Sequence, residues 1–268
     1  MTKSFSSRRW LLVLVITLVS APVFAQTPEP ADKENEVLAI LWQQQSGEHR
    51  ALCYQAYNLA RMLLDRDLRN HRIRMRRALI VDLDETVWDT STYEAQNVKR
   101  KTGYPQGWEE WMQKERATAL PGAVEFLNYA NSRGVRVFYV TNRVTTAKEA
   151  TANNLKKLGF PAVNDETLLM RDDPVIESKT KRRETIARKY HVVLLMGDDL
   201  NDFDAVFEKS RTVAARLDAA DQNRSKFGTH FIVLPNPMYG NFANAFYDYN
   251  FKLTEKQKSD KRHSLLRD

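Results

Sequence analysis

A short apolar run that ends in two carboxylates constrains the fold of this chain more than any other feature. Residues 78–83 read ALIVDL, and Asp82 and Asp84 stand at the end of the run. A short run of apolar residues without polar alternation is typical of a strand that is buried on both faces. Such strands belong to parallel sheets that helices cover on both sides. We therefore expect a buried strand that ends in a pair of acidic side chains.

The rest of the chain alternates between apolar strands and amphipathic helices. Further strands are predicted over 135–142, 191–199 and 230–236, and helices over 120–134, 145–159 and 179–190. Apolar residues at helical spacing predict one or two earlier helices over 35–70. This alternation predicts an α/β fold with a mostly parallel sheet and helices on both of its faces.

Residues 1–25 resemble a secretory signal peptide. A basic start precedes an apolar run over 10–19, and the ending Val23-Phe24-Ala25 predicts cleavage near Ala25. The apolar run is shorter than the ~20 residues of a bilayer span, so no stable membrane anchor is expected. The predicted location is the periplasm or the medium outside the cell, and secretory and twin-arginine export both remain open.

Net charge and cysteine content narrow the range of partners. The chain carries a formal net charge of +7 at pH 7, and three of its basic residues lie within 1–25. The remaining mild bias favours an anionic small-molecule substrate and does not by itself indicate a nucleic-acid polymer. Cys53 is the only cysteine, which excludes an internal disulfide, and its helical surroundings predict a buried side chain. These features define no oligomeric state.

Polar side chains follow the second and third predicted strands as well as the first. Thr141 and Asn142 end the second strand, and Asp198 follows the third. Asp202 comes four residues after Asp198, which returns it to the same face of a starting helix. The carboxyl ends of parallel strands meet at one edge of a sheet. All these side chains are therefore expected to share one crevice with the acidic pair of the first strand.

Carboxylates that share a crevice repel one another, and a hard divalent cation removes the conflict. Mg²⁺ takes oxygen ligands and is typically held by one or two carboxylates together with a substrate phosphate. Asp82 and Asp198 are the predicted direct ligands. Asp202 and the backbone carbonyl of Asp84 are expected to complete the metal site.

A lysine near the same crevice indicates that an anion binds there too. Lys179 is the candidate to neutralise phosphate oxygens, and Lys181 is its competitor. The Thr141 hydroxyl and the backbone N–H of Asn142 are able to donate hydrogen bonds to the same oxygens. A purely structural metal site would not need such a lysine.

Two carboxylates placed two residues apart can divide the chemistry of phosphate-ester hydrolysis. Asp82 is the candidate to attack phosphorus and form an aspartyl-phosphate. Asp84 is the candidate to protonate the leaving oxygen and later to take a proton from the attacking water. Leu83 lies between them and anchors the strand in the core.

In this order the motifs resemble the haloacid dehalogenase superfamily of aspartate-dependent phosphatases. The stretches DLDETVWDTS, LPGAVEFLNY, VFYVTNR, GDDLNDF and LPNPMYG are more similar still to the class C acid phosphatases of bacterial envelopes, which include lipoproteins that hydrolyse 5′-nucleotides. The likeness runs from about residue 75 to 240. It implies a Rossmann-like fold with a small helical cap. It also implies Mg²⁺-dependent hydrolysis of phosphomonoesters, with nucleoside monophosphates as the expected substrates.

The resemblance also assigns roles to individual residues. It implies a nucleophile at Asp82, an acid and base at Asp84, phosphate binding by Thr141 and Lys179, and metal binding by Asp198 and Asp202. Many relatives carry a lipid-modified cysteine after the cleavage site, and Gln26 stands there in this chain. This difference from the family bears on membrane anchoring and does not bear on the predicted chemistry.

These inferences divide the chain into successive segments. The signal peptide over 1–25 precedes a linker over 26–34, cap or accessory helices over 35–74, a catalytic domain over 75–240 and a charged, peripheral or frayed tail over 241–268. The catalytic domain contains an aromatic insert over 92–118. Because the insert follows the first strand, it is able to reach over the crevice.

Two aromatic residues are candidates for binding a nucleobase. Relatives sandwich the base between rings in the insert and near LPNPMYG, which indicates Trp108 and Tyr239. Stacking a base on an aromatic ring contributes ~1–3 kcal/mol and tolerates different bases. Trp108 and Trp111 are three residues apart, so packing inside a cap helix is an equal alternative.

The leading hypothesis is a secreted phosphomonoesterase that uses Mg²⁺. A narrow phosphatase or a phosphotransferase for another metabolite is the alternative among enzymes. A surface-exposed binding protein with little turnover is the alternative from another class. The four intact carboxylates, Asp82, Asp84, Asp198 and Asp202, favour an enzyme.

Overall fold

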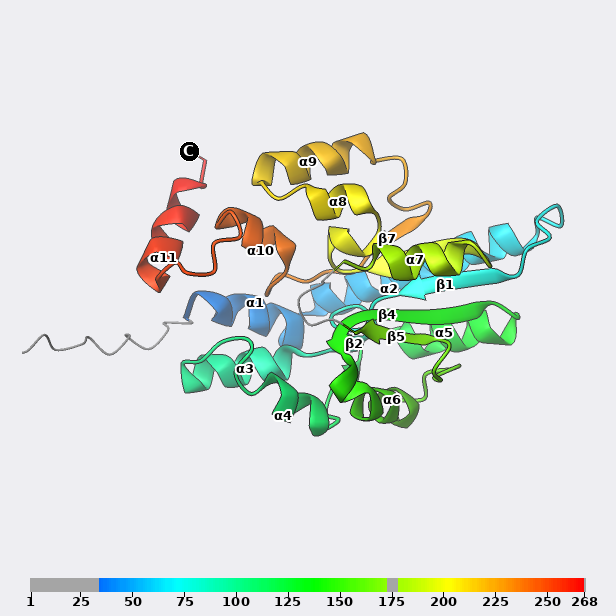
Figure 1. The fold of residues 1–268 in the computed structure, drawn as a ribbon, viewed down its shortest axis with the longest axis horizontal. Helices are drawn as coiled ribbons and strands as arrows, with labels where there is room; N and C mark the ends of the chain where they lie inside the picture. Colours follow the sequence, from blue (N-terminus) through cyan, green and yellow to red (C-terminus); the bar gives the residue numbers. More distant parts are fainter. Residues whose placement is uncertain (1–33, 173–177, 268) are drawn as a thin grey trace, which may run out of the picture. The chain divides into compact units, whose positions relative to one another are not determined.

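A parallel sheet of five strands lies at the centre of residues 34–172 and 178–267, which the computed structural model describes (Figure 1). The strand order is β5-β4-β1-β6-β7, and every neighbouring pair is parallel. The strands are β1 (Arg77–Val81), β4 (Arg136–Val144), β5 (Leu168–Arg171), β6 (His191–Gly197) and β7 (Phe231–Val233). The predicted α/β class is therefore correct, and β1, which ends in the acidic pair, is the central strand.

Alternate residues of β1 point to opposite faces of the sheet, and helices cover both of these faces. Leu79 and Val81 pack in one apolar cluster with α2 (Gly47–Leu68), α5 (Ala123–Ser132) and α6 (Lys148–Lys157). Ala78 and Ile80 pack in a second cluster with α7 (Thr180–Ala187), α8 (Ala205–Lys209) and α9 (Val213–Gln222). Figure 1 shows α8 and α9 on one side of the sheet and α5 and α6 on the other.

Smaller elements surround the carboxyl ends of the strands. They are α1 (Glu34–Gln45), β2 (Trp88–Asp89), α3 (Ser91–Arg100), α4 (Trp108–Gln113), β3 (Thr118–Ala119), the 3₁₀ turns η1 (Thr145–Ala147) and η2 (Leu200–Asp202), and α10 (Asn241–Phe246) and α11 (Glu255–Ser264). β2 and β3 pair antiparallel and join the two ends of the aromatic insert. The insert itself forms α3 and α4, and α1 packs against α3.

Several element boundaries differ from the sequence expectation. β5 was not predicted, because four residues at the edge of a sheet give little pattern to read. β4 continues past residue 142 to Val144. The helix expected from residue 120 begins at Ala123, because Gly122 takes a φ of +86° at the N-cap and leaves Pro121 ahead of the first turn.

The two ends of the described chain also refine the expected segments. α2 buries one side in the same core as β1 and so covers one face of the sheet. The tail forms α10 and α11, and α11 buries no residue. The predicted signal peptide lies outside the described residues, as does the linker except for Glu34, where α1 begins.

Within the described residues, no helix combines the length and the apolar character that a membrane crossing requires.

Candidate active site

The sheet places two predicted ligands side by side. In the register of β1 against β6, Val81 pairs with Met196, and the Asp82 N–H donates to the Met196 carbonyl at 3.0 Å. Asp82 is the residue after β1, and Asp198 is the residue after β6. Both carboxylates therefore leave the sheet at the same edge from neighbouring strands.

The turn after β6 brings in the third carboxylate. Asp199 caps η2, and its backbone N–H donates to Asp202 Oδ2 at 3.1 Å, which turns that side chain back toward the strand end. The close approach requires a glycine at the end of β6. A Cβ on Gly197 would lie 2.3 Å from Asp202 Oδ2. The GDDLND stretch thus folds its own last carboxylate against its first residue.

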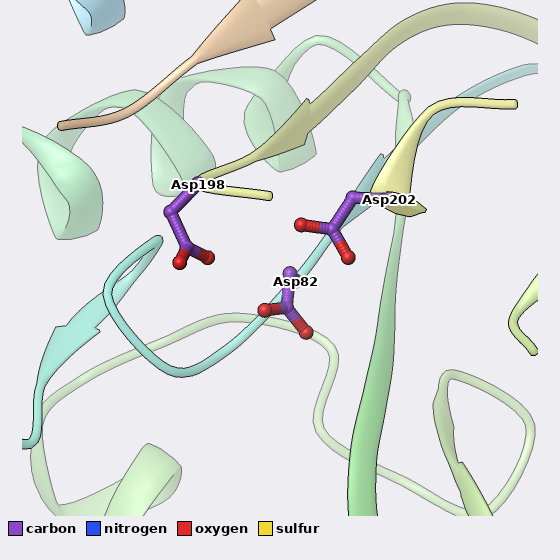
Figure 2. Close-up of side chains that lie close together, drawn as sticks. All are labelled: Asp82, Asp198 and Asp202. Carbon is purple, nitrogen blue, oxygen red and sulfur yellow. The ribbon is translucent and has the colours of Figure 1, made fainter. Parts of the chain in front are cut away.

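Asp82, Asp198 and Asp202 form one acidic cluster. One carboxylate oxygen from each residue lies within 4.8 Å of the others. Figure 2 shows the three side chains directed toward a common space beyond the strand ends. The structure therefore brings together the three predicted metal ligands that act through their side chains.

Lys179 lies inside this cluster. Its Nζ donates to an oxygen of Asp82 and, at 2.6 Å, to Asp202 Oδ1, and its side chain is buried. Lys181, the competing lysine, is exposed on α7. Of the two lysines, the structure therefore brings only Lys179 to the carboxylates.

Burial is the main influence on the charges of the cluster. It raises the pKa of Asp82 to about 7, with Lys179 opposing and Asp202 adding to the increase. Burial also raises the pKa values of Asp198 and Asp202 above their usual range. For Lys179, burial alone would lower the pKa, but Asp202 and Asp82 outweigh it and raise the value.

The acidic cluster fits a hard divalent cation. It offers three oxygen donors, and the positive charge of Lys179 is shared between two of the three carboxylates. Mg²⁺ prefers such oxygen donors and keeps further positions for water or phosphate. A dication here would offset the repulsion and the loss of hydration that raise the three carboxyl pKa values.

Asp198 is held by two residues that the sequence analysis did not single out. Thr86 Oγ1 donates to Asp198 Oδ1 at 3.1 Å, and Asn236 Nδ2 donates to Oδ2 at 2.8 Å. Partners of this kind orient metal-binding side chains in proteins. Both residues lie inside quoted motifs, DLDETV and LPN, so their place in those motifs was the available signal.

Asp84 is near the cluster but faces a different partner. Its carboxylate accepts hydrogen bonds from the Arg143 guanidinium, with Nη2 at 2.7 Å from Oδ1, and from Trp88 Nε1 at 2.9 Å. Arg143 is buried and was missed, although it directly follows Thr141-Asn142 in the VTNR stretch. The structure does not include the Asp84 carboxylate in the acidic cluster.

Thr141 and Asn142 lie within β4, close to its end. Thr141 is buried, and its Oγ1 accepts from the Arg143 N–H at 3.1 Å. Asn142 Oδ1 accepts from Arg182 Nη2 at 2.8 Å, and Arg182 also donates to the Thr141 carbonyl. Arg182 therefore binds the backbone of Thr141 and the side chain of Asn142.

The two aromatic candidates are both engaged with protein neighbours. The Trp108 ring stacks on Trp111 with centroids 5.3 Å apart and meets Tyr93 edge-on at 4.8 Å. The Tyr239 hydroxyl donates to a carboxylate oxygen of buried Glu85. Both Trp108 and Tyr239 remain partly exposed. Part of the Trp108 ring therefore packs against Trp111 and Tyr93.

Comparison with known proteins identifies similar chains. Residues 16–242 match the family described as HAD superfamily, subfamily IIIB (Acid phosphatase). The crystal structure of the class C acid phosphatase from Bacillus anthracis with tungstate bound is similar, with a TM-score of 0.84 and 40% identity, over 88% of this chain and 98% of that one. A second structure of the same Bacillus anthracis enzyme matches with a TM-score of 0.84 and 39% identity.

Plant proteins match over a shorter region. The stem 28 kDa glycoprotein of Glycine max is 31% identical over 102 residues, which cover 35% of this chain and 39% of that protein. A stem 31 kDa glycoprotein of Glycine max matches over 35% of this chain and 34% of its own length. The chain thus spans between a third and two fifths of the length of these curated relatives.

Proposed function

Because this chain belongs to the haloacid dehalogenase superfamily, subfamily IIIB, a family of acid phosphatases, we propose that it hydrolyses phosphomonoesters with the help of Mg²⁺. The observation that carries the proposal is the meeting of Asp82, Asp198 and Asp202 around buried Lys179 at the strand ends. A cation site and an ammonium group beside a nucleophilic carboxylate suit a phosphate dianion. The tungstate bound to the Bacillus anthracis relative is itself a tetrahedral oxyanion.

In the proposed reaction Asp82 attacks phosphorus and forms an aspartyl-phosphate. Thr141, the N–H of Asn142 and Lys179 hold the phosphoryl oxygens. Asp82, Asp198, Asp202 and the Asp84 carbonyl would hold Mg²⁺, which would supply positive charge for the approach of the anionic phosphate. These roles follow from the resemblance of the motifs and from the chemistry of the residues.

Asp84 serves both half-reactions in this proposal. It protonates the leaving oxygen as the first ester bond breaks, and it then accepts a proton from the water that attacks the aspartyl-phosphate. Its position two residues beyond Asp82 and outside the acidic cluster suits a group that handles protons and does not bind the metal through its side chain.

We further propose that nucleoside monophosphates are substrates. Trp108 and Tyr239 would then flank the base, and both are partly exposed. The resemblance to nucleotide-hydrolysing class C phosphatases supports this step. Hydrolysis rates measured over nucleotides, sugar phosphates and aryl phosphates would distinguish a nucleotidase from a phosphatase of another specificity.

Release of phosphate from an aryl phosphate tests the general proposal. The wild-type protein should hydrolyse it in the presence of Mg²⁺ and lose the activity in EDTA. Asp82→Asn should abolish turnover, because the amide cannot form the acyl-phosphate. Substantial activity of Asp82→Asn would rule out the covalent mechanism. A fully inactive wild type that still binds Mg²⁺ would indicate a binding protein on the same fold.

The location outside the cytoplasm is also proposed. The basic start, the apolar run over 10–19 and the small residues before Gln26 support it. Amino-terminal sequencing of protein recovered from the envelope or medium should begin at Gln26. A retained Met1 in a cytoplasmic fraction would contradict the proposal.

A further inference from the structure

The Arg143 side chain is fully committed to the neighbourhood of Asp84. The Arg143 side chain is 2% exposed, and its guanidinium binds the Asp84 carboxylate through two nitrogens. Nε lies 3.0 Å from Oδ1 and 3.1 Å from Oδ2, and Nη2 lies 2.7 Å from Oδ1. Such paired contacts restrict the position and the rotation of a carboxylate.

The two oxygens of Asp84 differ in their surroundings. Oδ1 accepts from Arg143 Nε, from Arg143 Nη2 and from Trp88 Nε1 at 2.9 Å. Within the described part of the chain, Oδ2 accepts one hydrogen bond, from Arg143 Nε at 3.1 Å. Three donor groups therefore reach Oδ1, and one of them, Arg143 Nε, also reaches Oδ2, so the protein leaves Oδ2 the less occupied of the two oxygens.

Three indole rings surround the same guanidinium. The Arg143 Cζ lies 4.4 Å from the Trp88 ring centre, 5.0 Å from that of Trp108 and 5.7 Å from that of Trp111. Rings at this range attract a guanidinium and exclude water from it. The aromatic insert thus contacts the group that holds Asp84, whether or not it also contacts a substrate.

We infer that Arg143 is a positioning residue for acid catalysis: with Trp88 it blocks Oδ1 of Asp84 and presents Oδ2 as the oxygen that carries the proton to the leaving group. The inference rests on the proposed phosphatase function. It adds that the aromatic insert, through Trp108 and Trp111, acts on the leaving-group step by fixing Arg143.

The proton transfer balances at Oδ2. As the phosphorus–oxygen ester bond breaks, its electron pair moves to the leaving oxygen, and the Oδ2–H bond delivers the proton to that oxygen. Asp82 has become the phosphorylated residue, and Asp84 is left as a carboxylate. Water then attacks phosphorus and gives a proton to Oδ2, while the bond between phosphorus and the Asp82 oxygen breaks. Phosphate leaves, Asp82 is again a carboxylate, and Asp84 is again protonated.

A series of phosphate esters with different leaving groups tests the inference through kcat/KM. Arg143→Lys keeps a positive charge but cannot make the paired contacts. It should lower kcat/KM for phenyl or alkyl phosphates by about 10- to 100-fold, within the range of acid–base assistance. For dinitrophenyl phosphate, whose leaving group departs without a proton, the loss should stay below about 3-fold.

Arg77→Lys is the matched control. Arg77 is another largely buried arginine that binds an aspartate, with Nε 2.6 Å from Asp67 Oδ1, and it lies at the start of β1, away from the strand ends. This variant should keep the wild-type dependence on the leaving group. If Arg143→Lys folds poorly, Trp88→Phe provides a second variant, because it removes one donor to Oδ1 and should show the same selective loss at smaller size.

A double-mutant cycle checks that Arg143 acts through Asp84. In an Asp84→Asn background, Arg143→Lys should change kcat/KM for phenyl phosphate by less than about 2-fold, because effects of residues that act together are not additive. An additional loss equal to that in the wild type would overturn the inference. So would equal losses on all esters, or a rise in KM alone.

The outcomes separate the inference from the proposed function. If the wild type hydrolyses every ester and Arg143→Lys loses all of them equally, the inference fails while the phosphatase assignment stands. If the wild type hydrolyses none, both fail. Trp108→Ala adds a further contrast: a loss that follows the leaving group supports the inference, and a loss confined to nucleotides, at an unchanged leaving-group dependence, contradicts the role given to this ring.

Discussion

Gly197 is the single residue on whose small size the acidic cluster most depends. A Cβ there would lie 2.3 Å from Asp202 Oδ2 and 2.4 Å from Asp202 Cβ, which is closer than non-bonded atoms approach one another. A displaced Asp202 side chain would strain or lose its hydrogen bond from the Asp199 N–H. The glycine therefore allows a carboxylate on η2 to reach the end of β6.

Gly197→Ala should displace Asp202 and lower kcat/KM by about 100-fold, the size expected when a reacting group moves by about an ångström. Steady-state kinetics on an aryl phosphate measures the loss. Gly47→Ala is the control, because a Cβ at Gly47 meets nothing within 4 Å. Wild-type activity in Gly197→Ala would show that Asp202 is dispensable.

Lys179 gives the second prediction at this scale. Replacing it in Lys179→Met leaves Asp82 and Asp202 buried without their cation, and removing one partner of a buried pair typically costs about 3–5 kcal/mol. Denaturant unfolding of the metal-free protein should show this loss, and the phosphatase activity should disappear. Lys181→Met, at an exposed position, should change neither. Equal effects of the two variants would contradict the assignment of Lys179.

At the scale of single elements, α2 contains a buried histidine that links its packing to pH. His49 is 2% exposed, lies 3.6 Å from Cys53 Sγ and meets the Trp42 ring edge-on. Burial lowers the pKa of His49, Arg50 lowers it further, and Asp89 partly opposes them. The folded protein therefore favours the neutral imidazole.

The stability contributed by His49 should be lost as the pH falls. Between the unfolded value of 6.5 and the lower folded pKa, the unfolded chain binds more protons, so the free energy of unfolding decreases on acidification. His49→Gln should remove this part of the dependence. Unfolding midpoints of both proteins, recorded from about pH 7.5 to about pH 5, measure this difference. Parallel curves would show that His49 does not contribute; His230, whose pKa burial also lowers, is unchanged in both.

At the scale of the whole molecule, the acidic cluster joins segments that are far apart in the chain. Asp82 follows the central strand, Asp198 and Asp202 come more than a hundred residues later, and Thr86 and Asn236 clamp Asp198 from both sides. A cation bound there would therefore be bound only by the folded protein. Its binding energy should appear as stability.

Mg²⁺ should raise the free energy of unfolding by about 2.7 kcal/mol at a concentration a hundred times its dissociation constant. Thermal unfolding with increasing Mg²⁺, reversed by EDTA, measures the shift. Asp198→Asn should abolish it, and Asn236→Ala should weaken it by releasing one oxygen of Asp198. An equal shift in Asp198→Asn would show that Mg²⁺ binds elsewhere.

The pattern of local residues was sufficient for the main elements. Unbroken apolar runs predicted β1, β4, β6 and β7, because a strand covered on both faces needs apolar residues on both. β5 was missed because its four residues lie at the edge and follow a loop without a clear signal. The charged α11 was assigned to a tail for a similar reason, since none of its residues is buried.

The sequence alone determined which residues could meet, because a parallel sheet gathers whatever follows its strands at one edge. Asp82, Asp198 and Asp202 were identified in this way, and the structure brings them within reach of one another. Which neighbour each side chain faces was decided only by the tertiary structure. The choice of Lys179 over Lys181 depends on how α7 packs, and the contact of Arg143 with Asp84 joins residues 59 positions apart. No local pattern records such contacts, since they arise from the packing of separate elements around a shared core.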